Sequence, residues 1–259
     1  MQRTVVIDCF PESARAYAHG YVVVAVDVIR ATTSAISVAA TGGRCFPVAT
    51  VEAALQLKAK LKNPLLAGER AGEIAPGFDM NNSPAELAAR RDVSRPVILL
   101  SSSGTKLLHE ASRCDTLYLA CLRNWRYLAT HLAGRHERVA LIGAGTRGDF
   151  REEDQICCAW IARKLLAAGY EPENRETVGL VARWALEDPA AILVSKSVDF
   201  LRRTGQLKDL DFILSHINDL PMVFVQEAGE VFAVASSESI PTPGLGIPLT
   251  PGTRRIWPC

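Results

Sequence analysis

Short apolar runs alternate with amphipathic segments along roughly the first 170 residues of the chain. The run Val22–Val26 is unbroken and mostly β-branched, which predicts a strand buried on both faces of a parallel sheet. Similar runs lie at 4–8, 44–48, 65–68, 97–100, 116–120 and 138–142. Because segments with helical periodicity separate these runs, the pattern predicts an α/β fold, with a mostly parallel sheet flanked by helices (α/β/α).

After Gly169 the pattern changes. Helical segments are expected at about 174–186, 189–203 and 206–216, too closely spaced for further parallel β-α-β units, so we expect a C-terminal helical block that forms a layer against the sheet. Two apolar runs around Gly229 predict a terminal hairpin.

The length and the absence of a low-complexity linker predict a single domain over residues 1–259, in which two lobes, about 1–150 and 151–259, could be distinguished. The apolar hairpin from Val223 to Ala235 could serve as a contact in a homodimer.

The composition is that of an ordinary globular protein, with 48% hydrophobic and 22% charged residues. A net charge of +1 gives no overall attraction for nucleic acid or an anionic membrane, so we expect neither as a partner. The N-terminus lacks the pattern of a secretory signal, and the seven cysteines form no Cys-x-x-Cys pair. We therefore expect a cytoplasmic protein with reduced cysteines.

Charged and hydroxyl side chains gather where the predicted strands end. Asp27 and Arg30 follow one strand, Glu69 follows another, and the hydroxyl-rich segment 101–105 follows a third. In open α/β sheets, ligands bind at the carboxyl ends of the parallel strands. Taken alone, Asp27 and Arg30 are equally well explained as a solvated ion pair, but the repetition at several strands favours a site.

These residue types suit phosphoryl chemistry. Carboxylates bind Mg²⁺, which prefers a few acids together with water and a substrate phosphate. Arginines hold phosphate or sulfonate through paired donors, and the glycine and hydroxyls of segment 101–105 suit an anion. The combination predicts a reaction on a small, doubly anionic molecule.

Two other functions stay open. Gly143-x-Gly145-x-x-Gly148 has the form of a dinucleotide fingerprint, but no buried strand ending in an acid follows about 20 residues later, which disfavours a dinucleotide oxidoreductase. A non-catalytic binder or sensor of a phosphorylated or sulfonated metabolite would use the same residues as an enzyme.

Several motifs resemble those of the 2-phosphosulfolactate phosphatase family, in the same order, from about residue 4 to 236. They are Asp27-Val-Ile-Arg30-Ala-Thr-Thr33, Gly68-Glu69-Arg70, Gly77-Phe78-Asp79-x-x-Asn82-Ser83-Pro84-x-Glu86, the segment 101–105, and Glu153-Asp154. The resemblance implies a magnesium-dependent phosphatase that converts 2-phosphosulfolactate to sulfolactate on a route to coenzyme M. At Ser103 the chain has a hydroxyl where the family has an amide, and Asn81 replaces a glycine.

From the residues and the resemblance together we assign provisional roles. The catalytic residues are expected to be Asp27, Arg30, Glu69 and Arg70. Some of Asp27, Glu69, Asp79 and Asp154 are expected to hold Mg²⁺. Substrate binding is expected from Thr32, Thr33, Asp79, Asn82, Ser83, Ser103, Gly104, Thr105 and Arg147.

Overall fold

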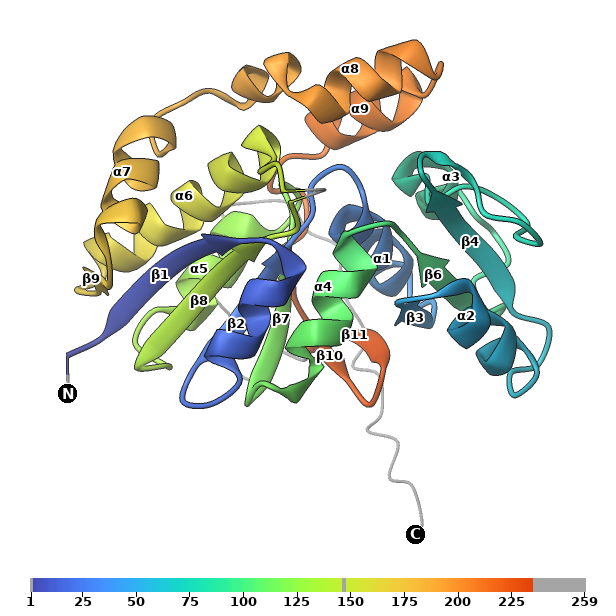
Figure 1. Cartoon of the computed structure of the whole chain (residues 1–259), viewed down its shortest axis with the longest axis horizontal. Helices are drawn as coiled ribbons and strands as arrows, with labels where there is room; N and C mark the ends of the chain where they lie inside the picture. Colours follow the sequence, from blue (N-terminus) through green and yellow to red (C-terminus); the bar gives the residue numbers. More distant parts are fainter. Residues whose placement is uncertain (1, 146–147, 235–259) are drawn as a thin grey trace, which may run out of the picture.

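The computed structural model describes residues 2–145 and 148–234. In that part of the chain, eleven strands form one sheet in the order β5-β4-β6-β3-β11-β10-β7-β2-β8-β1-β9 (Figure 1). The strands are β1 (Thr4–Cys9), β2 (Val22–Val26), β3 (Cys45–Val48), β4 (Leu65–Arg70), β5 (Glu73–Ile74), β6 (Val97–Leu100), β7 (Thr116–Ala120), β8 (Arg138–Gly143), β9 (Glu171–Pro172), β10 (Val223–Glu227) and β11 (Glu230–Val234).

The α-helices of the described residues are α1 (Ala31–Ala40), α2 (Val51–Lys58), α3 (Pro84–Ala88), α4 (Gly104–Glu110), α5 (Trp125–Leu132), α6 (Glu152–Ala167), α7 (Arg175–Trp184), α8 (Lys196–Arg203) and α9 (Leu207–Ser215). Short 3₁₀ segments lie at η1 (Pro11–Tyr17), η2 (Ala111–Arg113) and η3 (Pro189–Val194). No helix in the described ranges combines the length and the apolar character needed to cross a bilayer.

Strand β2 lies inside the sheet and is covered on both faces, as its sequence predicts. Successive side chains of a strand point to opposite faces. Val22, Val24 and Val26 accordingly join one buried cluster with residues of α5 and α6, whereas Val23 and Ala25 join a second cluster with residues of α1 and α4. The α/β/α arrangement is confirmed.

The predicted hairpin exists, but it lies in the middle of the sheet. β10 pairs with β7 and β11 pairs with β3, both antiparallel, so the hairpin joins the parallel block β7-β2-β8-β1-β9 to the block β4-β6-β3. Phe224 and Val231 are buried there. Both edges of the hairpin are therefore paired within the chain, and its part in a homodimer contact stays a prediction.

The bend of the sheet at the hairpin brings the two blocks together at their carboxyl ends. In a flat sheet, the three successive antiparallel pairings from β7 to β3 would place those ends at opposite edges. β11 and β3 share only the pair Val231 and Cys45 in register, and in Figure 1 β1 and β4 both rise toward the same central region. Residues that follow β2, β4 and β6 line one cavity, so the sheet must twist or bend between the two blocks.

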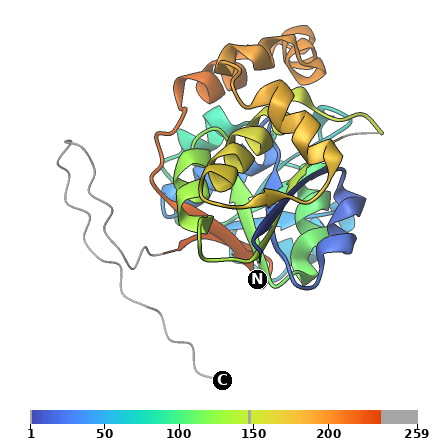
Figure 2. The same ribbon diagram turned by 90° about the vertical axis from the view of Figure 1, so that its left-hand side faces the viewer.

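The C-terminal helical block differs from the expected layer. Helix α7 packs on α6 and β1, but α8 and α9 lie beyond the carboxyl ends of the strands, at the top of Figures 1 and 2, where α9 contacts α3. These two helices form a cover over the edge of the sheet where the polar loops meet.

Candidate active site

A cavity of about 390 Å³ lies between the carboxyl ends of the strands and the cover. Its lining comes from the loop after β2, the β4–β5 turn, Asn82, segment 101–103, residues 149 and 151 before α6, and helix α8. Phe200 of α8 contacts Gly72 so closely that a side chain at Gly72 would overlap its ring. The cover and the β4–β5 turn therefore meet above the cavity.

Asp27 lies on the inner wall of this cavity and is only 6% exposed. The hydroxyl of Thr32 accepts a hydrogen bond from the backbone amide of Asp27 at 2.9 Å. The same hydroxyl lies 2.7 Å from the carbonyl oxygen of Ala120 at the end of β7. Burial, together with the negative charges of Glu153 and Glu69, raises the pKa of Asp27 to about 7, although the Ala31 amide and Arg30 favour its ionised form.

Glu153 and Asp154 occupy the first turn of α6, and both are buried. Asp154 accepts the amides of Val28 at 2.8 Å and Ala144 at 3.2 Å, which fastens α6 to the ends of β2 and β8. No well-formed hydrogen bond reaches either carboxylate oxygen of Glu153, although the Ser195 and Ser197 hydroxyls lie close enough to favour its ionised form and to lower its pKa. Burial raises the pKa of Glu153, and burial with the charges of Asp27 and Glu153 raises the pKa of Asp154.

Glu69 joins two segments of the cavity wall. One of its oxygens accepts the Ser102 amide at 2.6 Å, and the other accepts the Gly72 amide at 2.7 Å and the Ser102 hydroxyl at 2.9 Å. The carboxylate is thus held between the β4–β5 turn and the segment that precedes α4.

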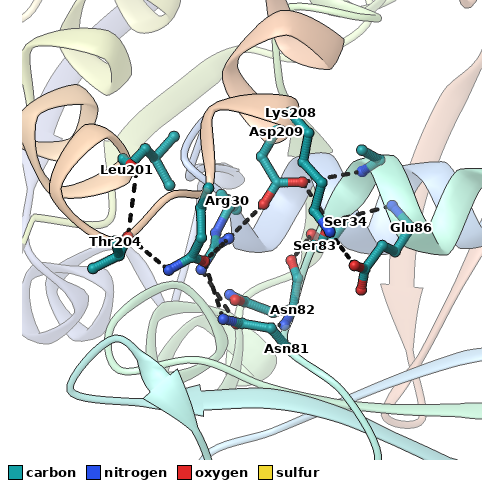
Figure 3. Close-up of polar contacts among 12 residues, drawn as sticks. Arg30, Ser34, Asn81, Asn82, Ser83, Glu86, Leu201, Thr204, Lys208 and Asp209 are labelled. Atoms are coloured by element: carbon teal, nitrogen blue, oxygen red, sulfur yellow. Dashed lines mark hydrogen bonds and ion pairs between the residues drawn. The ribbon is translucent and has the colours of Figure 1, made fainter.

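Arg30 is the buried cation of the cavity, with 5% of its surface exposed. Figure 3 shows its guanidinium pointing toward Asp209 of α9, to which Nη1 donates at 2.5 Å. Nη1 also donates to Gln206 at 2.5 Å, and Nη2 donates to Asn81 at 3.2 Å.

Gly104 begins α4 directly against Asp27. A Cβ at this position would collide with the Asp27 carboxylate and with the side chain of Ala31. In the same segment, Ser101 and Thr105 cap one another through bonds of 2.9 to 3.0 Å, so their hydroxyls are used within the turn. Ser103 remains in the lining of the cavity.

Comparison with known proteins agrees with this arrangement. The model of the family described as 2-phosphosulpholactate phosphatase matches residues 9–229. The chain belongs to the 2-phosphosulpholactate phosphatase family. The resemblance recognised from the motifs is thereby confirmed, and the structure shows where this family member places each motif.

Individual relatives cover most of the chain. A Deinococcus radiodurans protein named probable 2-phosphosulfolactate phosphatase is 33% identical over 211 residues, which are 80% of this chain and 86% of that protein. Proteins of the same name from Symbiobacterium thermophilum and Thermus thermophilus are 32% identical over 213 residues and 34% identical over 212 residues. Each alignment spans 80% of this chain, and 84% and 87% of the respective relative.

The structure places two of the expected site residues outside the cavity lining. Arg70 is exposed and outside the cavity lining, because Glu69 and Arg70 are consecutive on β4 and face opposite ways. Asp79 is also exposed and outside the lining; it accepts the Leu66 amide at 2.9 Å and pairs with Arg95 at 3.2 Å. In this structure Asp79 fastens the β4 edge and lies away from the cavity, and its role as a metal ligand stays a prediction.

Three of the expected hydroxyls serve the backbone. Besides the bonds of Thr32, the hydroxyl of Thr33 donates to the Val28 carbonyl at 2.8 Å. Ser83 caps α3, and its hydroxyl donates to Asp209. None of these three lines the cavity, whereas Asn82 does, and its buried side-chain oxygen has no hydrogen-bond partner. Arg147 lies outside the described residues.

Some lining residues are absent from the sequence-based assignment. Arg151, Lys196 and Arg203 contribute cationic side chains, and Nη1 of Arg151 is buried without a partner. Arg151 stands next to the acidic start of α6, a signal that could have identified it. The α8 residues carried no such signal, because only the folded chain places α8 over the cavity. Glu153 was recognised within a motif, but Asp154 was expected to be the ligand.

The acids of the cavity fit a divalent cation. In residues 2–145 and 148–234, no three acidic, cysteine or histidine side chains stand close enough together to form a metal site by themselves. Mg²⁺ needs few protein ligands, since it keeps several waters and binds substrate phosphate. A cation beside Asp27 would offset the negative charges of Glu153 and Glu69, which together with burial oppose the ionisation of Asp27.

Proposed function

We propose that this protein hydrolyses the phosphate monoester of 2-phosphosulfolactate to sulfolactate and inorganic phosphate, with Mg²⁺ as cofactor. The membership of the chain in its family and the names of its relatives support the reaction. The observation that carries the proposal is the burial of Asp27 in the wall of a cavity that Glu69 and Arg30 also line, with the charge of Glu153 close behind it.

Asp27 would hold the cation at the cavity wall, with Glu69 in reach through water, and the buried Glu153 would add negative charge beside Asp27. Bound there, Mg²⁺ would neutralise phosphate charge and favour a nucleophilic water. Asp154 has a different role in this proposal, because its two oxygens accept backbone amides and keep the start of α6 in place.

The substrate carries a phosphate, a carboxylate and a sulfonate, so it needs several cationic partners. Arg30 would bind the phosphoryl oxygens, and Arg151, Lys196 and Arg203, which line the same cavity, would bind the other anionic groups. Lys196 forms an exposed pair with Asp149 at 2.9 Å, which a multiply charged ligand could replace at little cost. Contact between Phe200 and Gly72 would limit the entry of bulk water.

The direct test is release of inorganic phosphate by the purified full-length chain. We expect turnover of 2-phosphosulfolactate with Mg²⁺, weaker turnover of 2-phospholactate, which lacks the sulfonate, and loss of activity with a chelator. Tight binding of 2-phosphosulfolactate with no phosphate release in Mg²⁺ would instead identify a binder or sensor. Activity unchanged after chelation would refute the metal requirement.

We also propose a cytoplasmic location, which cell fractionation would test. The described cysteines form no disulfide, in keeping with a reducing compartment. A homodimer stays a prediction with no surface assigned to it.

A further inference from the structure

We propose that Asp209, in α9, is a positioning residue that fixes the Arg30 guanidinium for the phosphoryl group of the substrate. The inference rests on the proposed function, since it assigns the cover of the cavity a part in binding phosphate. Asp209 lies in none of the sequence motifs considered above, and it is separated from Arg30 by 179 positions in the chain.

Asp209 is completely buried and makes bonds in three directions. One carboxylate oxygen accepts a hydrogen bond from Nη1 of Arg30 at 2.5 Å. The other accepts the Ser83 hydroxyl and, at 3.4 Å, the Ala85 amide at the start of α3 (Figure 3). The carboxylate is therefore anchored on α3 independently of Arg30, as required of a group that sets the direction of another side chain.

A second set of bonds restricts the same guanidinium. The side-chain oxygen of Gln206 accepts hydrogen bonds from Nη1 of Arg30 and, at 3.0 Å, from the side-chain amide of Asn81. The side-chain oxygen of Asn81 accepts a hydrogen bond from Nη2 of Arg30. These bonds use three of the five N–H groups of the arginine. Because Arg30 also lines the cavity, its remaining donors are available to an oxyanion. The backbone amide of Asn82 donates to Asn81 at 2.8 Å, which ties the network to another lining residue.

Stability alone gives little reason for such a pair. Burying two charges costs desolvation energy, and well-packed apolar residues often replace a buried ion pair without loss of stability. Orientation of a planar guanidinium for bidentate binding of phosphate is a benefit that an apolar replacement cannot supply.

The chain contains a matched control for the experiment. Arg123 and Asp219 form a similar pair, with bonds of 3.0 and 2.6 Å and only 9% of the Arg123 side chain exposed. Neither residue lines the cavity. Asp219→Asn therefore weakens the same kind of interaction away from the site.

The test compares Asp209→Asn with Asp219→Asn. Loss of the charged partner of Arg30 is expected to raise KM, and the inhibition constant of inorganic phosphate, by roughly 10- to 100-fold, with a smaller change in kcat. In an Arg30→Ala background, Asp209→Asn is expected to raise KM and the inhibition constant of phosphate by less than about threefold, because the effect of Asp209 on binding passes through Arg30. Asp219→Asn is expected to leave both constants within about twofold of the parent.

A second variant keeps the test decisive if Asp209→Asn does not fold. Gln206→Ala removes one bond to Nη1 at a partly exposed position and is expected to raise both constants by about 3- to 10-fold. The inference is overturned if each folded variant binds phosphate as tightly as the parent. It is also overturned if Asp209→Asn weakens phosphate binding as much in the Arg30→Ala variant as it does in the parent. Calorimetric binding of inorganic phosphate needs no turnover, so failure of the parent to hydrolyse its substrate would refute the proposed function separately.

Discussion

Asp27 is held in an environment that opposes its charge, and the consequence is a linked dependence of stability and activity on pH. Its pKa is about 7, against an ordinary value of 3.8, because of burial and the nearby charges of Glu153 and Glu69. Between those values the folded chain retains a proton that the unfolded chain has lost. The contribution of Asp27 to stability is therefore complete below about pH 4, falls as the pH rises toward 7, and stays low above it.

Asp27→Asn removes this titration while nearly preserving the shape of the side chain. With chelator present, the stability of the variant relative to the parent is expected to rise on the order of 2 kcal/mol as the pH increases from about 5 to about 8, because only the parent must ionise a buried carboxyl. In Mg²⁺, the variant is expected to lose catalysis. Urea unfolding at the two pH values measures the gain. Asp211→Asn, at an exposed position, is the control; a pH-independent difference for Asp27→Asn would contradict the assigned environment of Asp27.

The sequence predicted which residue types meet at the site better than it predicted their separate roles. Asp27, Arg30 and Glu69 reach the cavity as expected from their positions at strand ends. Glu153 and Asp154 are consecutive acids, and only the folded chain shows that the backbone amides of Val28 and Ala144 occupy Asp154, while no well-formed hydrogen bond reaches Glu153. Such pairing depends on the fold and leaves no local signal.

At the scale of elements, the close approach of α4 to α1 depends on Gly104. Alanine is ordinarily favoured over glycine inside a helix by about 1 kcal/mol. At Gly104, however, a Cβ would collide with Asp27 and Ala31, so the propensity gain cannot be realised without moving α4 away from the carboxylate. The glycine thus sets the width of the inner wall of the cavity.

Gly104→Ala is expected to lower the unfolding free energy by about 1–3 kcal/mol and to reduce kcat/KM at least about tenfold. Gly179→Ala in α7, where no atom lies within 4 Å of the added Cβ, is the matched control and should stabilise the chain by about 0.5–1 kcal/mol without a change in activity. Chemical unfolding and steady-state kinetics on both variants are the measurements. Equal behaviour of the two variants would contradict the packing described at Gly104.

The elements themselves were largely predictable, but their partners were not. The strand at Val22–Val26 and the capped helix beginning at Pro84 appear where the local pattern places them. The hairpin was also foreseen, yet its position between β7 and β3 is decided by pairing with distant strands. The location of α8 and α9 over the edge of the sheet, likewise, follows from tertiary packing that their amphipathic pattern does not specify.

At the scale of the whole molecule, the site exists because one bent sheet gathers segments from most of the described chain. The loops after β2 and β6 and the β4–β5 turn come from two blocks that the hairpin joins, and α6 and α8 complete the cavity. The central claim is that this convergence places Asp27 and Glu69 in the cavity wall, with the buried Glu153 beside Asp27, where the three acids act together in phosphate ester hydrolysis.

The most direct measurement is kcat/KM for phosphate release from 2-phosphosulfolactate by Glu153→Gln, with circular dichroism to confirm folding. Glu153 is fully buried, and glutamine removes its charge while nearly preserving its size and its ability to accept from the Ser195 and Ser197 hydroxyls. We predict a folded protein whose kcat/KM falls at least about 100-fold, because the negative charge beside Asp27 is lost. A folded variant with near-parental kcat/KM would contradict the account.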